Sequence, residues 1–188
     1  DTINRFHMSK ASGEIRASNP CSEFMYLDNT ACNLASLNLI KFYQDGIFNT
    51  DKFSVDVDRV FKAQDAIVDY SSYPTKQIAE TSYRHRPIGL GFANLGSLLM
   101  LMGIPYDSDQ GRAWAGMITA TMTAQCYFTS SEIARIKTPF AEYGKNKKSA
   151  LAVLAKQMNA VHEIDWSLLP ETYKQTTYAL WMKAMAHV

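Results

Sequence analysis

The hydrophobic periodicity of this 188-residue chain changes once, near Ser54, and this change limits the folds that the chain can adopt. Before residue 54 the sequence is turn-rich. Only the alternating run L-A-S-L-N-L-I-K-F at 34–42 predicts a strand there, and the turn signal Q-D-G-I-F-N-T-D follows it. After residue 54 the apolar spacing is helical, with one further strand signal in R-P-I-G-L-G-F at 86–92. Strands this few and scattered do not form a sheet of their own, so we expect a mostly helical segment of a larger α/β protein.

Capping and stop signals place the expected helices. The first begins with Ser54 or Asp56 as its N-cap, and Asp107 caps the longest one. The apolar residues that the first helix should turn to one side are Val57, Val60, Phe61, Ile67 and Val68. The expected ranges are 54–70, 75–81, 93–102, 108–136, 148–160 and 171–187. The last helix is still running where the chain stops, which also favours a segment of a larger protein.

Composition excludes several classes of protein. Hydrophobic residues make up 47% of the chain and charged residues 20%, which suits one sizeable buried core. The net charge of +1 gives no electrostatic reason to expect binding to nucleic acid or to an anionic membrane. Three cysteines at irregular spacing fit neither a disulfide scaffold nor a zinc site, so a cytoplasmic protein is expected. The four histidines form no closely spaced pair, so no metal site is expected.

Glycines punctuate the uncharged stretch at 87–106, which approaches the length of a membrane span. Four glycines and a proline at each end favour a buried strand followed by a helix instead. The run G-L-G-F-A-N-L-G at 89–96 does not have the spacing of a dinucleotide-binding fingerprint. We therefore expect these glycines to allow tight packing between the strand and the helix.

Two of the three cysteines lie in a polar segment near the start of the chain. Cys21 stands in N-P-C-S-E at 19–23, eleven positions before Cys32. In an extended backbone the side chains of Asn19, Cys21 and Glu23 would point to the same side, about 6–7 Å apart. Pro20 favours such a backbone because it restricts the residue before it. A neighbouring carboxylate disfavours a thiolate, so this pattern predicts a neutral thiol beside a base and a hydrogen-bonding amide.

A structural interpretation of the cysteines stays open at this point. A cysteine in a loop most often serves as a small hydrophobic residue, and Cys32 alone carries no catalytic signal. Cys126 lies inside the expected helix at 108–136 and is expected to pack in the core.

Two longer runs carry a resemblance to one enzyme family. The run A-S-N-P-C-S-E-F-M-Y-L-D-N-T-A-C-N-L-A-S-L-N-L at 17–39 resembles the active-site finger loop of the ribonucleotide reductase large subunit. The run R-H-R-P-I-G-L-G-F-A-N-L-G-S-L-L-M-L-M-G-I-P-Y-D-S at 84–108 resembles the family's R-x-(I/L)-G-L-G segment and the helix after it. The resemblance implies a ten-stranded α/β barrel with the cysteine loop threaded through its centre. Residues 1–188 would then be part of one catalytic barrel domain, with the cysteine loop and a strand in 1–53 and a mainly helical segment in 54–188.

The resemblance also implies a role for each residue that matches the loop. Cys21 aligns with the cysteine that carries a transient thiyl radical, Glu23 with the general base, and Asn19 with the amide that hydrogen-bonds the substrate hydroxyls. Ser22 is a further candidate for contact with the substrate. Cys32 aligns with one of two cysteines that reduce the 2′-carbon and close to a disulfide, with its partner outside this chain. A thiyl radical forms from a neutral thiol, which agrees with the pattern around Cys21.

Details of the loop favour one class of the family. A proline directly after the asparagine and a short gap between the cysteines resemble the adenosylcobalamin-dependent enzymes more than the metal-subunit-dependent class I enzymes. The cobalamin class implies adenosylcobalamin as cofactor and a ribonucleoside di- or triphosphate as substrate. An external dithiol such as thioredoxin would be the reductant, and the full-length enzyme would be a candidate homodimer. The alternatives are a class I large subunit and, from another class of protein, a helical interaction module with a structural cysteine loop. The segment alone is expected to be inactive, because the second redox cysteine and the phosphate-binding P-T-G-T-I motif are missing.

Overall fold

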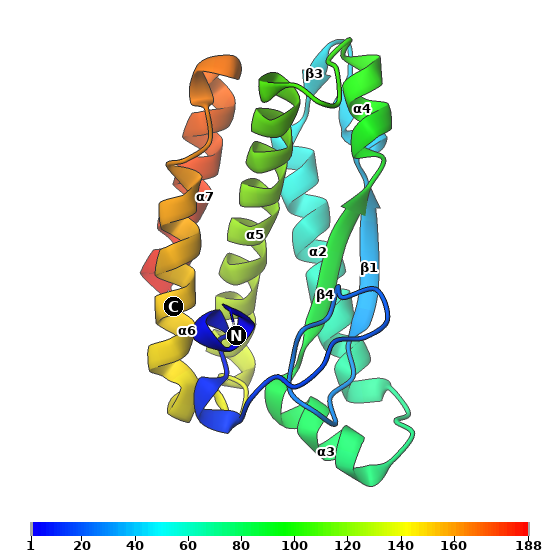
Figure 1. Ribbon diagram of the computed structural model, residues 1–188, viewed down its shortest axis with the longest axis vertical. Coiled ribbons are helices and arrows are strands. Elements are labelled where there is room, and N and C mark those ends of the chain that lie inside the picture. Colours follow the sequence, from blue (N-terminus) through cyan, green and yellow to red (C-terminus); the bar gives the residue numbers. More distant parts are fainter. Residues whose placement is uncertain (1, 188) are drawn as a thin grey trace.

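A single long helix stands at the centre of the molecule. The computed structural model describes residues 2–187, so both end residues of the expected 1–188 segment lie outside it. Helix α5 (Asp109–Lys137) has α2 (Thr50–Tyr70) on one side and α7 (Glu171–His187) on the other (Figure 1). Helix α6 (Tyr143–Val161) packs against α5 and the N-terminal turn η1 (Lys10–Ser12), and a two-stranded sheet covers the other side of α2.

The two predicted strands were expected not to form a sheet of their own, but they pair with each other as a two-stranded sheet. Strand β1 (Asn33–Asn38) runs parallel to β4 (Ile88–Ala93), with Asn33 opposite Ile88. A parallel pair needs a long crossover connection, which α2 and α3 (Lys76–His85) provide here. The expected fold class, a mostly helical α/β segment, therefore agrees with the described residues. The ten-stranded barrel that the resemblance implies stays a prediction.

The first strand is shorter than the expected 34–42. It ends at Asn38, whose side chain accepts a hydrogen bond from the backbone N–H of Ile40 and starts the 3-10 turn η2 (Leu39–Phe42). Buried side chains at both ends of this turn favour the turn over continued strand. A small hairpin of β2 (Tyr43–Gln44) and β3 (Ile47–Phe48) follows, closed at the predicted Asp-Gly turn.

Helix α2 begins four residues earlier than its predicted first residue, so Ser54 and Asp56 are not its N-cap. Asn49 caps it, accepting a hydrogen bond of 2.9 Å from the backbone N–H of Lys52. Phe53 is fully buried and packs edge-on against Phe42, with ring centroids 5.1 Å apart. That contact holds the extra first turn in place.

The long helix α5 is also capped one residue away from the prediction. Ser108, not Asp107, accepts the hydrogen bond from the backbone N–H of Gly111, at 2.9 Å. The Asp107 carboxylate instead accepts a hydrogen bond from Arg112 at 2.8 Å.

Other boundaries differ from expectation by a few residues. Helix α6 starts at Tyr143, five residues before the predicted start at 148, because Asn146 is buried against the N-terminal segment. Helix α3 continues four residues beyond the predicted end at 81. The remaining elements are α1 (Thr2–Phe6), η1 (Lys10–Ser12), α4 (Leu95–Leu101) and η3 (Trp166–Leu168).

The buried face of α2 is not the one predicted at its C-terminal end. Ile67 was expected to face the core but is 46% exposed. Gln64 and Asp65 lie on the buried face instead, at 2% and 6% exposure. The helical phase that buries Phe53 and Val57 continues through these two polar residues. Both make hydrogen bonds described below.

The core forms on both sides of α5, which explains why this helix is not simply amphipathic. The main group of buried residues includes Phe48, Trp114 and Tyr173, and the Tyr173 hydroxyl accepts a hydrogen bond from the backbone N–H of Phe48 at 3.1 Å. Cys126 packs against this core, as predicted, and burial raises the pKa of its thiol to about 12. None of the helices within residues 2–187 combines the length and apolar character needed to cross a membrane.

Candidate active site

The cysteine loop leaves the helical body from a buried anchor. The segment before the loop is tied to α6 by Asn146, which is 1% exposed. Its Oδ1 accepts a hydrogen bond from the backbone N–H of Ala11 at 2.8 Å, and its Nδ2 donates to the Ser12 hydroxyl at 2.7 Å. Ile15 is buried just after this anchor. The start of the loop is therefore fixed on the α6 side of the molecule.

The loop returns to the body at α3, close to where it started, since the hydroxyls of Ser9 and Tyr26 lie 2.5 Å apart. Leu27 is buried there, and the ring of Tyr26 packs edge-on against His85 with centroids 5.7 Å apart. The backbone N–H of Ala31 donates to the hydroxyl of Ser82, which is fully buried, at 2.9 Å. Residues 13–31 thus form a loop held at both ends, beside β1 and β4 in the lower half of Figure 1.

The tip of the loop is a tight turn and not the extended segment that the residue pattern predicted. The backbone N–H of Ser22 donates to the carbonyl of Asn19 at 3.1 Å, and Ser22 has φ 62°. The Asn19 side chain accepts from the backbone N–H of Phe24 at 3.0 Å. Pro20, taken as support for an extended chain, instead occupies the second position of a turn, where its fixed φ also fits. The prediction failed because the asparagine side chain closes the turn locally.

The predicted site residues of the tip share this turn. Cys21, Ser22 and Glu23 are exposed, whereas Asn19 is half-buried because its side chain is used in the turn. The Ser22 hydroxyl lies 3.3 Å from that of Ser18. The turn therefore presents the Cys21 thiol to the surroundings with a carboxylate two residues away.

Cys32 lies at the start of β1 in a more enclosed environment. Its Sγ donates to the backbone carbonyl of Asn33, at 3.4 Å. Burial and, to a smaller extent, the negative charge of Glu23 together raise the pKa of the Cys32 thiol to about 11. The charge of Glu23 thus acts on the Cys32 thiol, which couples the loop tip electrostatically to the second cysteine.

A small pocket of about 170 Å³ opens beside Cys32. Cys32 and Asn33 line one side of it, and the connection between α2 and α3, residues 71–74, lines the other. The pocket gives the half-buried thiol a space into which a second group could enter.

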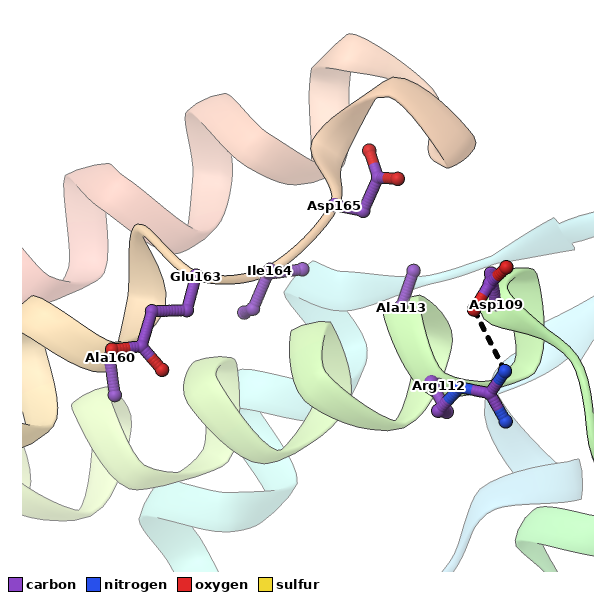
Figure 2. Close-up of a pocket in the computed structure, with 7 residues that line it drawn as sticks. All are labelled: Asp109, Arg112, Ala113, Ala160, Glu163, Ile164 and Asp165. Carbon is purple, nitrogen blue, oxygen red and sulfur yellow. Dashed lines mark hydrogen bonds and ion pairs between the residues drawn. The ribbon is translucent and has the colours of Figure 1, made fainter.

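A larger pocket, of about 290 Å³, lies between the start of α5 and the connection after α6. Figure 2 shows that Asp109 and Arg112 lie at the start of α5, whereas Glu163 and Asp165 belong to the connection after α6. Within the first turn of α5, Arg112 donates a hydrogen bond to Asp109 at 2.8 Å. None of its lining residues is a predicted site residue, and we assign it no part in the cysteine chemistry.

Two polar residues near the site were missed by the sequence analysis. Gln64 on α2 is buried, and its Nε2 donates to the carbonyls of Asn33, at 3.2 Å, and Gly89, at 2.9 Å. The Nδ2 of Asn33 donates back to the carbonyl of Gln64 at 3.1 Å. The available signal was the helical spacing that places Gln64 on the same face as Val57 and Val68.

The second missed residue, Arg86, ends α3 in a left-handed conformation with φ 50°. It donates to the carboxylates of Asp65, at 2.8 Å, and Asp69, at 2.6 Å, and Lys137 bonds both at 3.1 Å. Hydrogen bonding from Arg86 lowers the pKa of Asp69. This ion cluster joins α2, α3 and α5 just before β4 begins, so it fixes where that strand enters the sheet.

Comparison with known proteins agrees with the cysteine loop and the R-x-(I/L)-G-L-G run. The family described as "Ribonucleotide reductase, barrel domain" matches residues 1–185. The chain belongs to this family.

Individual relatives have the same class of name. The chain is 44% identical over 181 residues to a protein of Rhodopirellula baltica named "Vitamin B12-dependent ribonucleotide reductase", a match that covers 96% of the chain and 17% of the relative. Proteins with the same name in Streptomyces coelicolor and Agrobacterium fabrum are 48% and 47% identical, over 82% and 86% of the chain. These matches cover 16% and 13% of the two relatives, so the chain spans a small part of the proteins that it resembles.

Proposed function

We propose that this chain forms part of the catalytic barrel of a ribonucleotide reductase that converts ribonucleotides to 2′-deoxyribonucleotides through a thiyl radical on Cys21. The observation that supports this most directly is the loop. An exposed thiol at the tip of a turn stands two residues from a carboxylate that also acts on the second cysteine. Family membership and the names of the relatives support the same reaction.

In the proposed reaction each loop residue has one task. The Cys21 thiyl takes the 3′-hydrogen of the substrate, and Glu23 accepts the proton of the 3′-hydroxyl. Asn19 orients the substrate hydroxyls with the N–H groups of its side-chain amide. The oxygen of that amide already accepts a hydrogen bond from the backbone N–H of Phe24. Ser22 is placed to contact the substrate.

Cys32 supplies electrons in this scheme. Together with a partner cysteine outside this chain it gives two electrons and two protons to the substrate and closes to a disulfide, while the 2′-hydroxyl leaves as water. The raised pKa of Cys32 suits this role, because a thiol that keeps its proton at neutral pH can deliver a hydrogen. An external dithiol such as thioredoxin then reopens the disulfide by exchange.

Adenosylcobalamin is the proposed cofactor, supported by the names of the relatives. When bound, it supplies the radical that removes the hydrogen atom from the Cys21 thiol. The residues present fit this demand, since the Cys21 thiol is exposed at a turn that the Ser22 N–H and the Asn19 carbonyl close. The class I alternative, in which a separate metal subunit supplies the radical, has the weaker support.

The surroundings of the site follow from the same proposal. The parallel pair β1–β4 would be two strands of the ten-stranded barrel, with the cysteine loop inside it. The substrate would be a ribonucleoside di- or triphosphate, the compartment the cytoplasm, and the assembled enzyme a homodimer.

The decisive test uses the full-length enzyme with adenosylcobalamin and a dithiol. Cys21→Ser should abolish deoxyribonucleotide formation, whereas Cys32→Ser should allow at most one turnover per enzyme. Multiple turnover by Cys21→Ser would falsify the radical assignment and favour the rival reading of a helical interaction module with a structural loop. Activity that appears only when a separate metal subunit is added would exclude the cobalamin class.

A further inference from the structure

The environment of Gln64 points to a role that packing alone does not explain. This residue is 2% exposed and sits on a face of α2 that also buries Val57 and Val68. A buried amide costs free energy unless its polar atoms are hydrogen-bonded, so an apolar residue of similar size would fill this space at lower cost. The hydrogen bonds that its amide makes explain why a glutamine stands at this position.

Its amide holds the beginnings of two strands at once. Nε2 donates to the Asn33 carbonyl in β1 and to the Gly89 carbonyl in β4. Asn33 returns a hydrogen bond to the Gln64 backbone, so the first residue of β1 is held twice. The Oε1 atom of Gln64 is buried without a hydrogen-bond partner, so the donors are the groups that this site uses.

The Cys32 thiol contacts the same two residues, Asn33 and Gly89. Its Sγ donates to the Asn33 carbonyl, the acceptor that Gln64 also uses. On the other side, Sγ lies 3.0 Å from the position that a Cβ would take on Gly89. The sulfur is thus seated between a carbonyl and a glycine whose positions are both held by Gln64.

We propose that Gln64 is a positioning residue for the Cys32 thiol. By donating hydrogen bonds to the carbonyls of Asn33 and Gly89, it fixes the position of the sulfur beside the pocket. This inference rests on the proposed function, in which Cys32 must meet a partner sulfur and the substrate in a defined geometry. Reacting groups displaced by about 1 Å can lose about 100-fold in rate, so a fixed seat has a large effect on turnover.

The test compares two buried glutamines in the full-length enzyme. Gln64→Met keeps the side-chain volume and removes both donors. Gln125→Met is the matched control, because Gln125 is 7% exposed and bonds Thr129 within α5, away from the strands. The rate of alkylation of Cys32 by iodoacetamide, read by mass spectrometry without turnover, reports the seat directly. Cys126 in the core is the internal reference.

Gln64→Met should raise the alkylation rate of Cys32 by at least about three-fold and leave that of Cys126 unchanged, because a released thiol is more accessible. In dithiol-supported turnover its kcat should fall about 10- to 100-fold with little change in KM for the nucleotide. Gln125→Met should match the wild type in both measurements. If Gln64→Met does not fold, Gln64→Glu, which keeps the shape and at most one donor, should show the same direction of change.

Wild-type alkylation of Cys32 and wild-type kcat in Gln64→Met would overturn the inference. An equal change in Gln125→Met would also overturn it, because the effect would then be general destabilisation. Failure of the proposed function shows elsewhere, as multiple turnover by Cys21→Ser, and leaves the alkylation comparison valid.

Discussion

The Sγ atom of Cys32 lies 3.0 Å from the place where a Cβ atom would stand on Gly89, on the strand paired beside it. The same Cβ would overlap the Cδ2 atom of Leu34, the residue paired with Gly89. The half-buried cysteine therefore depends on the absence of a side chain at this position. This relationship, between residues far apart in the chain, makes Gly89 the most sensitive position of the site.

Gly89→Ala should destabilise the chain by about 1 kcal/mol, because its Cβ would crowd the half-buried Sγ of Cys32, whereas the exposed Leu34 side chain can move aside. It should also change the alkylation rate of Cys32. Gly144→Ala is the control, because a Cβ on Gly144, a helical residue, meets nothing within 4 Å, and it should be neutral or stabilising by up to about 1 kcal/mol. Urea unfolding of the purified 188-residue chain measures the free energy of unfolding of both variants. Equal stability of the two variants would contradict the close packing of Gly89.

Glu23→Gln should lower the pKa of Cys32, because it removes the negative charge that helps to raise it. The value should stay above that of a free thiol, since burial is the larger cause and remains. At a fixed pH near 9 the Cys32 alkylation rate should therefore rise, as measured by mass spectrometry across a pH series. The exposed carboxylate of Glu14 supplies the control variant Glu14→Gln. An unchanged Cys32 profile in Glu23→Gln would show that the carboxylate does not act on the thiol.

Asn19 should have two separable roles. Asn19→Asp keeps an oxygen that can accept from the Phe24 N–H, so the turn should stay closed, while the amide donors proposed for the substrate are lost. Asn19→Ala loses both the acceptor oxygen and the amide donors. Amide hydrogen exchange at Phe24 should be faster only in Asn19→Ala, and both variants should reduce turnover of the full-length enzyme. Slow exchange at Phe24 in Asn19→Ala would mean that the side chain does not close the turn.

Arg86→Met should be among the most destabilising single changes. It leaves the carboxylate of Asp65, which is 8% exposed, and that of Asp69 with only Lys137 as partner. We expect a loss of about 2–4 kcal/mol, below the value for a fully buried pair because Asp69 is partly exposed. Arg112→Met removes an arginine whose two carboxylate partners are exposed, and should change stability little. A small effect of Arg86→Met in thermal unfolding would rule out the cluster as a fixed point of the fold.

The cluster of Arg86, Asp65, Asp69 and Lys137 should make the folding stability depend on pH in the acidic range. Hydrogen bonding from Arg86 places the folded-state pKa of Asp69 below its usual 3.8. The contribution of Asp69 is therefore complete above that value and is lost as the pH falls through the lower, folded-state value. From pH 5 toward pH 3 the wild type should lose stability more steeply than Asp69→Asn. Parallel curves for the two proteins in pH-dependent urea unfolding would exclude this linkage.

Local patterns predicted the elements that depend on near neighbours in the chain. The strands around 34–38 and 88–92, the Asp-Gly hairpin turn and the helices α5 and α7 follow from apolar periodicity, caps and glycine or proline signals. The resemblance of the cysteine loop also came from a continuous run of residues. Two of the errors were local competitions that the pattern could not weigh: Ser108 against Asp107 as cap, and a closed turn at Asn19 against an extended chain.

The sequence by itself determined where strands and helices form, and which cysteines and carboxylate belong to one loop. Only the tertiary structure decided that β1 and β4 pair in parallel, that Gln64 holds both of them, and that the charge of Glu23 reaches Cys32. The physical reason is distance along the chain. Periodicity reports which face of an element is buried, but a hydrogen bond between residues 25 or 31 positions apart depends on how the elements pack. Cys32 is placed by such contacts.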